Sequence, residues 1–327
     1  MKENSDINWI AQTGFGIKVY SVEYQVPQIH ENILEIIYCL QGSVKFFYSY
    51  EEFLLQKGEF ISADKDAFYL YAGKDNICVS FYFDLDQFSK KYPYIKDILF
   101  ICEGTSDAES GYPSLRHEEM KGALLALLYY MVRTTETCME AAVLSQIQRA
   151  ADHIIQLMVD QFDILYYYKP KTAFTQVQIE RHRELQGYMN RHKFEKLPLR
   201  ILADRFHLTA KYISEFLSRN GLPYQDMLTY LRANASEAYL LGTELSIVEI
   251  SEACGFSDVK YYYKAFRKWY RCTPREFRAK YRAAEQQEQM DYDIDLRSLR
   301  EEIEHQILEH YMKAHLGQIG ENLEQLL

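Results

Sequence analysis

Hydrophobic residues recur with two different periods on the two sides of Asp84. Before it, short runs rich in Ile, Val, Tyr and Phe are separated by turn signals such as Gln41-Gly42-Ser43. Beyond it, residues 114–134 and 139–167 carry apolar side chains at helical spacing. Many short strands at even spacing predict an antiparallel sandwich or barrel, and a 3.6-residue period predicts amphipathic helices. The expected strands are Val19–Val26, Leu34–Leu40, Val44–Tyr50, Phe53–Gln56, Glu59–Ser62, Phe68–Tyr71 and Ile77–Phe83.

The chain is therefore expected to be an α+β multidomain protein. We divide it into a β domain at 1–90, a helical connector at 91–171, an all-α domain at 172–283 and an acidic helical tail at 284–327. The tail places several apolar residues on one helical face. Three roles stay open for that face: a second association surface, a contact with the all-α domain, or a solvated appendage. Its apolar residues include Leu296, Leu299, Ile303 and Ile307.

The charge of the chain is unevenly distributed. The whole sequence has a net charge of -10, yet residues 180–282 hold 19 Lys/Arg against 12 Asp/Glu, a net of +7. The flanking segments are acidic, with net charges of -9 for 1–179 and -8 for 283–327. A basic block between acidic ones is the local footprint that binding to a polyanion requires. Charge alone leaves an ordinary solvated surface equally open.

Two helix-turn-helix patterns lie inside the basic block. In the first, at Leu199–Leu217, an apolar face ends at Phe206, and the hydroxyl of Thr209 can cap the next helix. That helix is expected to turn Tyr212, Ile213, Phe216 and Leu217 inward. Its outward residues are Lys211, Ser214 and Glu215.

The second pattern, at Ser246–Trp269, has clearer signals for where its helices begin and end. Ser246 and Glu249 have the spacing of a capping box. Gly255 can supply the positive φ that ends the helix, and Ser257 is expected to cap the next one. That second helix should bury Tyr262, Phe266 and Trp269. Its predicted outer residues are Lys260, Tyr261, Tyr263, Lys264, Arg267 and Lys268.

These residues resemble the C-terminal signature of AraC/XylS-type regulators. The likeness runs from Leu245-Ser246-Ile247 through Gly255-Phe256-Ser257-Asp258 to Thr273-Pro274-Arg275-Glu276-Phe277-Arg278, and extends more weakly upstream to about residue 180. It implies a homodimeric transcription regulator that binds operator DNA, with base contacts from positions 260, 261, 263 and 264. The sequence departs from the pattern at Glu215, Ser251 and Arg271.

The strand region resembles the cupin-like sensor domain of such regulators. Pro27-Gln28-Ile29-His30, Glu35, Leu40-Gln41-Gly42 and Lys57-Gly58-Glu59 fall in the expected order. The resemblance implies a small-molecule effector, with a sugar as one candidate. Small barrels can enclose one small molecule. The residues expected to line such a pocket are His30, Tyr38, Phe46, Tyr48, Phe68 and Tyr82.

Two other classes of function compete with this interpretation. A metal-dependent cupin enzyme with a helical appendage needs about three histidines and a carboxylate on one ion, whereas His30 is the only histidine before His117. We therefore expect no enzyme, no metal and no cofactor. The basic helices alone would also fit a module that binds an acidic protein. The basic outer face of the second helix pair favours DNA.

The remaining signals concern the cellular compartment. The six cysteines are scattered without metal-binding spacing, which favours buried, reduced thiols. The N-terminus lacks a basic stretch followed by an apolar run, and the longest apolar patch, Ala123–Val132, is too short to span a bilayer. We expect a cytoplasmic protein that has no membrane contact.

Overall fold

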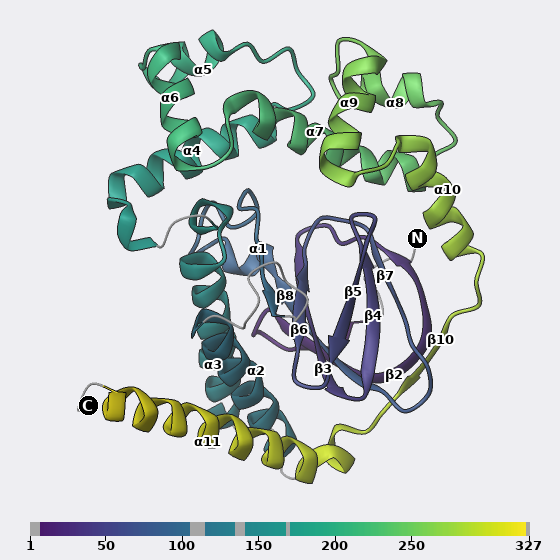
Figure 1. Ribbon diagram of the computed structural model, residues 1–327, viewed down its shortest axis with the longest axis vertical. Helices are drawn as coiled ribbons and strands as arrows, with labels where there is room; N and C mark the ends of the chain where they lie inside the picture. The colour runs from purple at the N-terminus through teal and green to yellow at the C-terminus, as the bar shows by residue number, and fades with distance from the viewer. Residues whose placement is uncertain (1–6, 105–114, 135–140, 168–170, 325–327) are drawn as a thin grey trace.

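The computed structural model describes residues 7–104, 115–134, 141–167 and 171–324, with side chains up to 313. An antiparallel sheet and its covering helices form one part, and a group of shorter helices lies against one end of the sheet (Figure 1). This arrangement confirms the predicted α+β class and the order of a β-rich N-terminal part before a helical C-terminal part.

The sheet consists of ten strands, all paired antiparallel within the described residues. The long strand β2 pairs with β8 along its first half and with β7 along its second half, so the sheet curls into a half-barrel. The order along the sheet is β5-β4-β7-β2-β8-β3-β6-β9. The strands are β1 (Trp9–Ile10), β2 (Phe15–Gln28), β3 (Ile33–Gln41), β4 (Ser43–Tyr48), β5 (Glu51–Gln56), β6 (Phe60–Ala63), β7 (Phe68–Tyr71), β8 (Ile77–Asp84), β9 (Glu103–Gly104) and β10 (Met290–Asp293).

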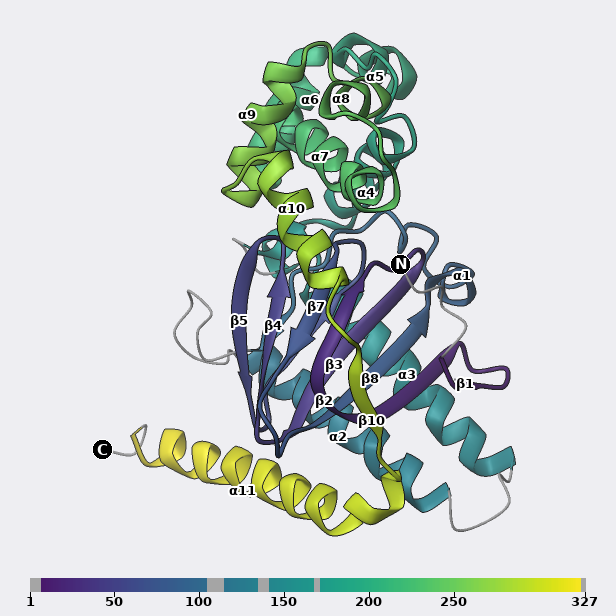
Figure 2. The same ribbon diagram turned by 90° about the vertical axis from the view of Figure 1, so that its right-hand side faces the viewer.

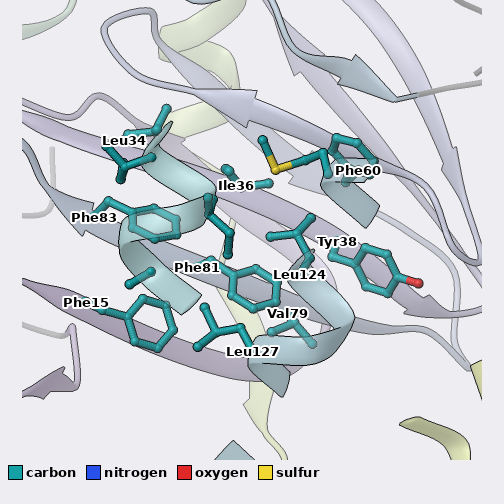
Figure 3. Packing of buried hydrophobic residues seen from close by; sticks show 14 of the residues in the cluster. Phe15, Leu34, Ile36, Tyr38, Phe60, Val79, Phe81, Phe83, Leu124 and Leu127 are labelled. Carbon is teal, nitrogen blue, oxygen red and sulfur yellow. The ribbon is translucent and has the colours of Figure 1, made fainter. Parts of the chain in front are cut away.

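Successive side chains of a strand point to opposite faces, and the two faces of this sheet form separate cores. Ile37 and Cys39 of β3 belong to the cluster inside the half-barrel. Leu34, Ile36 and Tyr38 belong to a larger cluster under two long helices. These helices, α2 (Leu115–Thr134) and α3 (Ala141–Gln161), follow the short helix α1 (Leu85–Phe88). Figure 3 shows side chains of α2 seated against the sheet.

The C-terminal segment folds back onto the N-terminal part. Strand β10 pairs with β2, and the 3-10 helix η4 (Leu296–Leu299) leads into α11 (Arg300–Glu324), which crosses α2 (Figure 2). Leu296, Leu299 and Ile303 are buried in the same core as the sheet and α2. Of the three roles left open for this apolar face, none is correct. It is an internal contact, and it lies on the sheet and α2 of the N-terminal part rather than on the basic domain.

The helices between residues 176 and 285 form two bundles joined by the long helix α7. The first bundle buries Leu202, Ile213 and Leu217, and the second buries Ile250 and Phe266. Two 3-10 turns, η2 (Ile164–Tyr166) and η3 (Lys171–Ala173), precede them. The helices are α4 (Gln176–Arg191), α5 (Leu199–Phe206), α6 (Ala210–Asn220), α7 (Tyr224–Gly242), α8 (Ile247–Ala253), α9 (Val259–Tyr270) and α10 (Pro274–Glu285).

Both bundles share hydrophobic contacts with the N-terminal part. Phe47, Ala67 and Tyr69 of the sheet belong to the core of the second bundle. Leu99 and Ile164 of the connector belong to, or pack against, the core of the first. The domain limits at 90, 171 and 283 stay predictions, but the sheet and the helical bundles are plainly packed against each other.

The structure bears on the predictions about the cysteines and about membrane-spanning helices. Five of the six cysteines are free and buried, as predicted, while Cys138 lies outside the described residues. Among the helices described, none is long and apolar enough to cross a bilayer.

Candidate nucleic-acid interface

The second helix-turn-helix unit, α8 and α9, is built largely as its sequence predicts. Ser246 accepts a hydrogen bond from the backbone N–H of Glu249, whose carboxylate accepts from the N–H of Ser246. Gly255 has a φ of 77°, and a Cβ at this position would lie 2.6 Å from the carbonyl oxygen of Phe194. The predicted cap at Ser257 is wrong: Asp258 accepts from the N–H of Lys260 instead, because its carboxylate is one residue closer to the free N–H groups.

The orientation of α9 is fixed by its buried side chains. Tyr262 and Phe266 are fully buried, and the Tyr262 hydroxyl donates to Ser236 Oγ at 2.8 Å. This turns Lys260, Tyr261, Lys264, Arg267 and Lys268 to solvent.

Two α9 side chains lie differently from their prediction. Tyr263 is only partly exposed and packs against the bundle core, so its ring is less available to a partner than predicted. Trp269 is half-buried instead of central to the core.

The exposed residues of α9 border a groove against α7. The groove has a volume of about 450 Å³ and lies between Gln225, Thr229, Tyr261 and Lys264. Its cations are not all free, since Lys268 forms an ion pair with Asp226 of α7. A groove with lysines on one wall can accept a phosphate backbone, which is attracted mainly by charge.

The first unit, α5 and α6, shows weaker chemistry. Thr209 caps α6 as predicted, accepting from the N–H of Tyr212 at 3.1 Å. The Tyr212 ring is 39% exposed rather than inward, and its hydroxyl accepts from Arg181.

The predicted outer residues of α6, Lys211, Ser214 and Glu215, are all exposed. Glu215 pairs with Lys211 at 4.0 Å and with Arg219 at 3.3 Å. It therefore offsets the positive charge of this helix.

The turn after α9 contains one backbone adaptation. Arg271 caps the helix with a φ of 54°, in the left-handed region that costs an L residue about 1–2 kcal/mol. Its guanidinium pairs with Glu51 of the sheet at 2.9 Å. The ion pair joins the second helix-turn-helix unit to the β domain. It is made by Arg271, a residue at which the sequence departs from the AraC/XylS-type pattern.

A buried polar network joins α7 to the β6–β7 loop. The Glu237 carboxyl accepts from the N–H of Ala67 at 2.6 Å and from the hydroxyl of Tyr270. Asp66 accepts from Asn234 of α7 at 2.7 Å and from Tyr48 of β4 at 2.7 Å. Burial raises the pKa of Glu237 well above its ordinary value. The network joins the second unit to the sheet through buried and half-buried polar groups.

Five of the six residues predicted to line an effector pocket are linked by ring contacts, and Tyr38 alone lies apart from them. His30 is buried 2.6 Å from Glu35, and its ring contacts Phe68 and Tyr82. Phe46 stacks between Phe68 and Tyr48, so these rings fill the half-barrel.

Tyr38 lies on the opposite face of the sheet from that group. Its hydroxyl donates to Gln306 of α11 at 2.6 Å.

A cavity of about 270 Å³ lies at the junction of the β domain, the connector and both helix-turn-helix units. Tyr48 is the one predicted pocket residue that lines it. Tyr230 of α7 and Trp269 of α9 form the opposite wall, and Phe100 and Glu103 come from the connector. Sequence analysis missed this site because its residues come from seven separate stretches that no periodicity relates.

Comparisons with known proteins agree with the local geometry. Residues 202–280 match the family model described as a helix-turn-helix domain. The C-terminal region is a helix-turn-helix domain of the AraC/XylS type. The matched residues include the capped helices α8 and α9 with their inward-facing Tyr262 and Phe266.

Several transcription regulators resemble the AraC/XylS-type domain. The HTH-type regulator YijO of Escherichia coli is 26% identical over 98 residues, which are 30% of this chain and 35% of that protein. The ornithine utilization regulator of Pseudomonas aeruginosa is 33% identical over 76 residues, or 23% of this chain and 22% of that protein. The E. coli xylose operon regulatory protein is 35% identical over 63 residues, 19% and 16% respectively. The chain thus spans about a third or less of these relatives.

The chain is also similar to two solved structures of bacterial proteins. The C-terminal domain of the response regulator yesN from Fusobacterium nucleatum is 32% identical, covers 30% of this chain and 98% of its own, and has a TM-score of 0.28. ToxT of Vibrio cholerae, solved with an unsaturated fatty acid, is 12% identical, covers 85% of this chain and 97% of its own, and has a TM-score of 0.41.

Proposed function

We propose that this protein is a sequence-specific DNA-binding transcription regulator whose operator affinity is set by a small molecule. The observation that carries the proposal is the α9 surface. The buried Tyr262 and Phe266 leave Lys260, Lys264 and Arg267 exposed together on the second helix of a capped helix-turn-helix pair. Such a helix enters the major groove, where lysine can donate to guanine O6 and N7.

The two outer helices, α6 and α9, are expected to contribute unequally to DNA binding. On α9 the exposed cations lie beside the groove against α7. On α6 the acid Glu215 offsets its neighbours Lys211 and Arg219. We therefore assign most phosphate attraction and base reading to α9, and a weaker, positioning contact to α6. A homodimer would present two such domains to two half-sites, as the resemblance implies.

The names of the relatives support a regulator and give no support to a cupin enzyme, since the matched proteins named above are transcription regulators. The small-molecule control rests on the junction between the sheet and both units. A ligand that fits one arrangement of that junction better shifts the population toward it.

The test is binding-site selection from a random duplex pool with the full chain. The full chain is needed because Phe47 and Tyr69 complete the core of the second unit. Lys264→Ala should relax base preference at one position and cost about 1–3 kcal/mol of affinity. Arg267→Ala should weaken all sequences alike and lower the salt slope by about one. Lys74→Ala, on an exposed turn of the β domain, is the matched control.

Three outcomes would count against the proposal. Absence of salt-sensitive DNA binding would remove the function. Binding without sequence preference would point to a general polyanion or acidic-protein partner. If Arg267→Ala changes base preference and Lys264→Ala does not, the facing of α9 is wrong.

A further inference from the structure

The junction cavity has an unusual composition for an effector site. Aromatic side chains line it from four parts of the chain: Tyr48 from β4, Phe100 and Tyr167 from the connector, Tyr230 from α7 and Trp269 from α9. Glu103 adds a carboxylate. Among the described residues that line the cavity, none is Lys, Arg or His. The walls therefore offer aromatic rings and one carboxylate, and no cationic side chain that would pair with an anion.

Near Tyr48 the cavity has two acidic neighbours, Asp64 and Asp66, and Lys65 offsets part of this charge at 3.9 Å from Asp64. The Tyr48 hydroxyl donates to Asp66 at 2.7 Å, and Asp66 is only 3% exposed. Burial raises the pKa of Tyr48 and of Tyr230, and the charges of Asp66 and Asp64 raise both further. The nearby charges thus disfavour an additional negative charge at this end of the cavity and favour a positive one.

We propose that the junction cavity binds a small organic cation, of the quaternary or alkylated ammonium class, as the effector of this regulator. The proposal rests on the proposed function and names the ligand class of its regulatory site. Ammonium groups bind over the faces of Trp and Tyr rings and gain most where water is excluded. A volume of about 270 Å³ accommodates such a head group with a short apolar body.

The position of the cavity explains how a ligand there would act on DNA binding. Its walls include Tyr48 and Ser49 of the β domain, Leu222 after α6, Tyr230 of α7 and Trp269 of the reading helix. A bound cation contacts both helix-turn-helix units and the sheet at once. It therefore favours whichever spacing of α6 and α9 closes the rings around it.

The experiment uses three probes of one shape with the full chain. Choline carries the cation, neohexanol replaces its nitrogen with carbon, and tert-butylacetate carries an anion. Calorimetric titration should show that choline binds about tenfold more tightly than neohexanol, with no binding of tert-butylacetate. Neohexanol or tert-butylacetate binding as tightly as choline, or choline failing to bind, would overturn the proposal.

Two variants locate the site. Tyr167→Ala removes a ring that is 40% exposed, and should weaken choline binding several-fold without unfolding the protein. Glu103→Gln should weaken choline and leave neohexanol unchanged. Tyr311→Ala, which removes a 60% exposed ring on α11 away from the cavity, is the matched control. Equal choline affinity in Tyr167→Ala, Glu103→Gln and the control would place the cation elsewhere and refute the site.

Coupling to DNA separates this inference from the proposed function. If choline changes operator affinity by some factor, operator DNA must change choline affinity by the same factor. Operator selection without any probe tests the DNA function alone. Sequence-specific DNA binding with no effect of choline would refute the cation and leave the regulator intact.

Discussion

The buried carboxyl of Glu237 should make the stability of the junction depend on pH. Burial raises its pKa well above the ordinary value, and the charge of Asp66 acts in the same direction. The folded protein therefore keeps a proton that the unfolded chain releases above about pH 4.3. Because the unfolded state then binds fewer protons, this contribution is fully present below the unfolded pKa and declines as pH rises toward the folded pKa.

The size of the effect follows from one proton. A difference of one bound proton changes the free energy of unfolding by about 1.4 kcal/mol per pH unit. Three other buried groups lie outside the window, and the buried cysteines Cys102, Cys254 and Cys272, whose pKa burial raises, contribute the same slope to the parent and to a variant at Glu237. Burial raises the pKa of Asp64 to about 6 and lowers the pKa of His117 and of His182 to about 4. Above about pH 7 these three groups have largely finished titrating in both states.

Glu237→Gln supplies the comparison because it imitates the protonated acid. Its amide oxygen can accept from the N–H of Ala67, and its amide nitrogen can donate to the hydroxyl oxygen of Tyr270. We expect the variant to lose the part of the pH slope that Glu237 contributes, so that its stability gains about 1.4 kcal/mol over the parent for each pH unit above about pH 7 in which the folded acid keeps its proton. Urea unfolding at each pH, followed by tryptophan fluorescence, measures it.

A matched variant excludes a general charge effect. Glu252→Gln changes an exposed carboxylate on α8 and should run parallel to the parent at every pH. If Glu237→Gln also runs parallel to the parent, Glu237 is ionised in the folded protein and the reasoning fails.

Three further substitutions test the packing. Tyr262→Phe loses the hydrogen bond to Ser236 and should cost about 1 kcal/mol in urea unfolding, with base preference in site selection unchanged; a changed preference would show that the hydroxyl also sets the facing of α9. Gly255→Ala should destabilise the protein by about 1–2 kcal/mol or more, because the φ of Gly255 is 77° and the Phe194 carbonyl is close. The control Gly242→Ala, at a position with no atom within 4 Å, should be neutral or stabilising. Equal melting temperatures for the two variants would contradict this reasoning. Gln306→Leu removes the hydrogen-bond partner of the Leu40 carbonyl and of the Tyr38 hydroxyl. The free energy of unfolding should fall by about 2 kcal/mol, and hydrogen exchange in β10 should become faster. Unchanged exchange would show that α11 does not hold the strand.

The sequence by itself determined the local structure of the DNA-binding region. Capping residues and helical spacing act within a few positions of one another, so Ser246, Gly255 and the buried face of α9 could be read directly. The alternation of strand residues likewise predicted the β-rich N-terminal part. The errors at this level concern single residues. Asp258 caps α9 in place of the predicted Ser257, and Tyr212 is exposed although it was predicted to point inward.

Only the tertiary structure decided which of these elements meet. Pairing of β10 with β2 and burial of Leu299 under α2 depend on contacts between residues more than 150 positions apart. The seating of Glu237 on Ala67 and the junction cavity between Tyr48 and Trp269 depend on such contacts too. No local spacing encodes such contacts, because they follow from how whole faces pack together. The junction cavity that we propose as the effector site is therefore a second candidate beside the barrel interior that the sequence predicts.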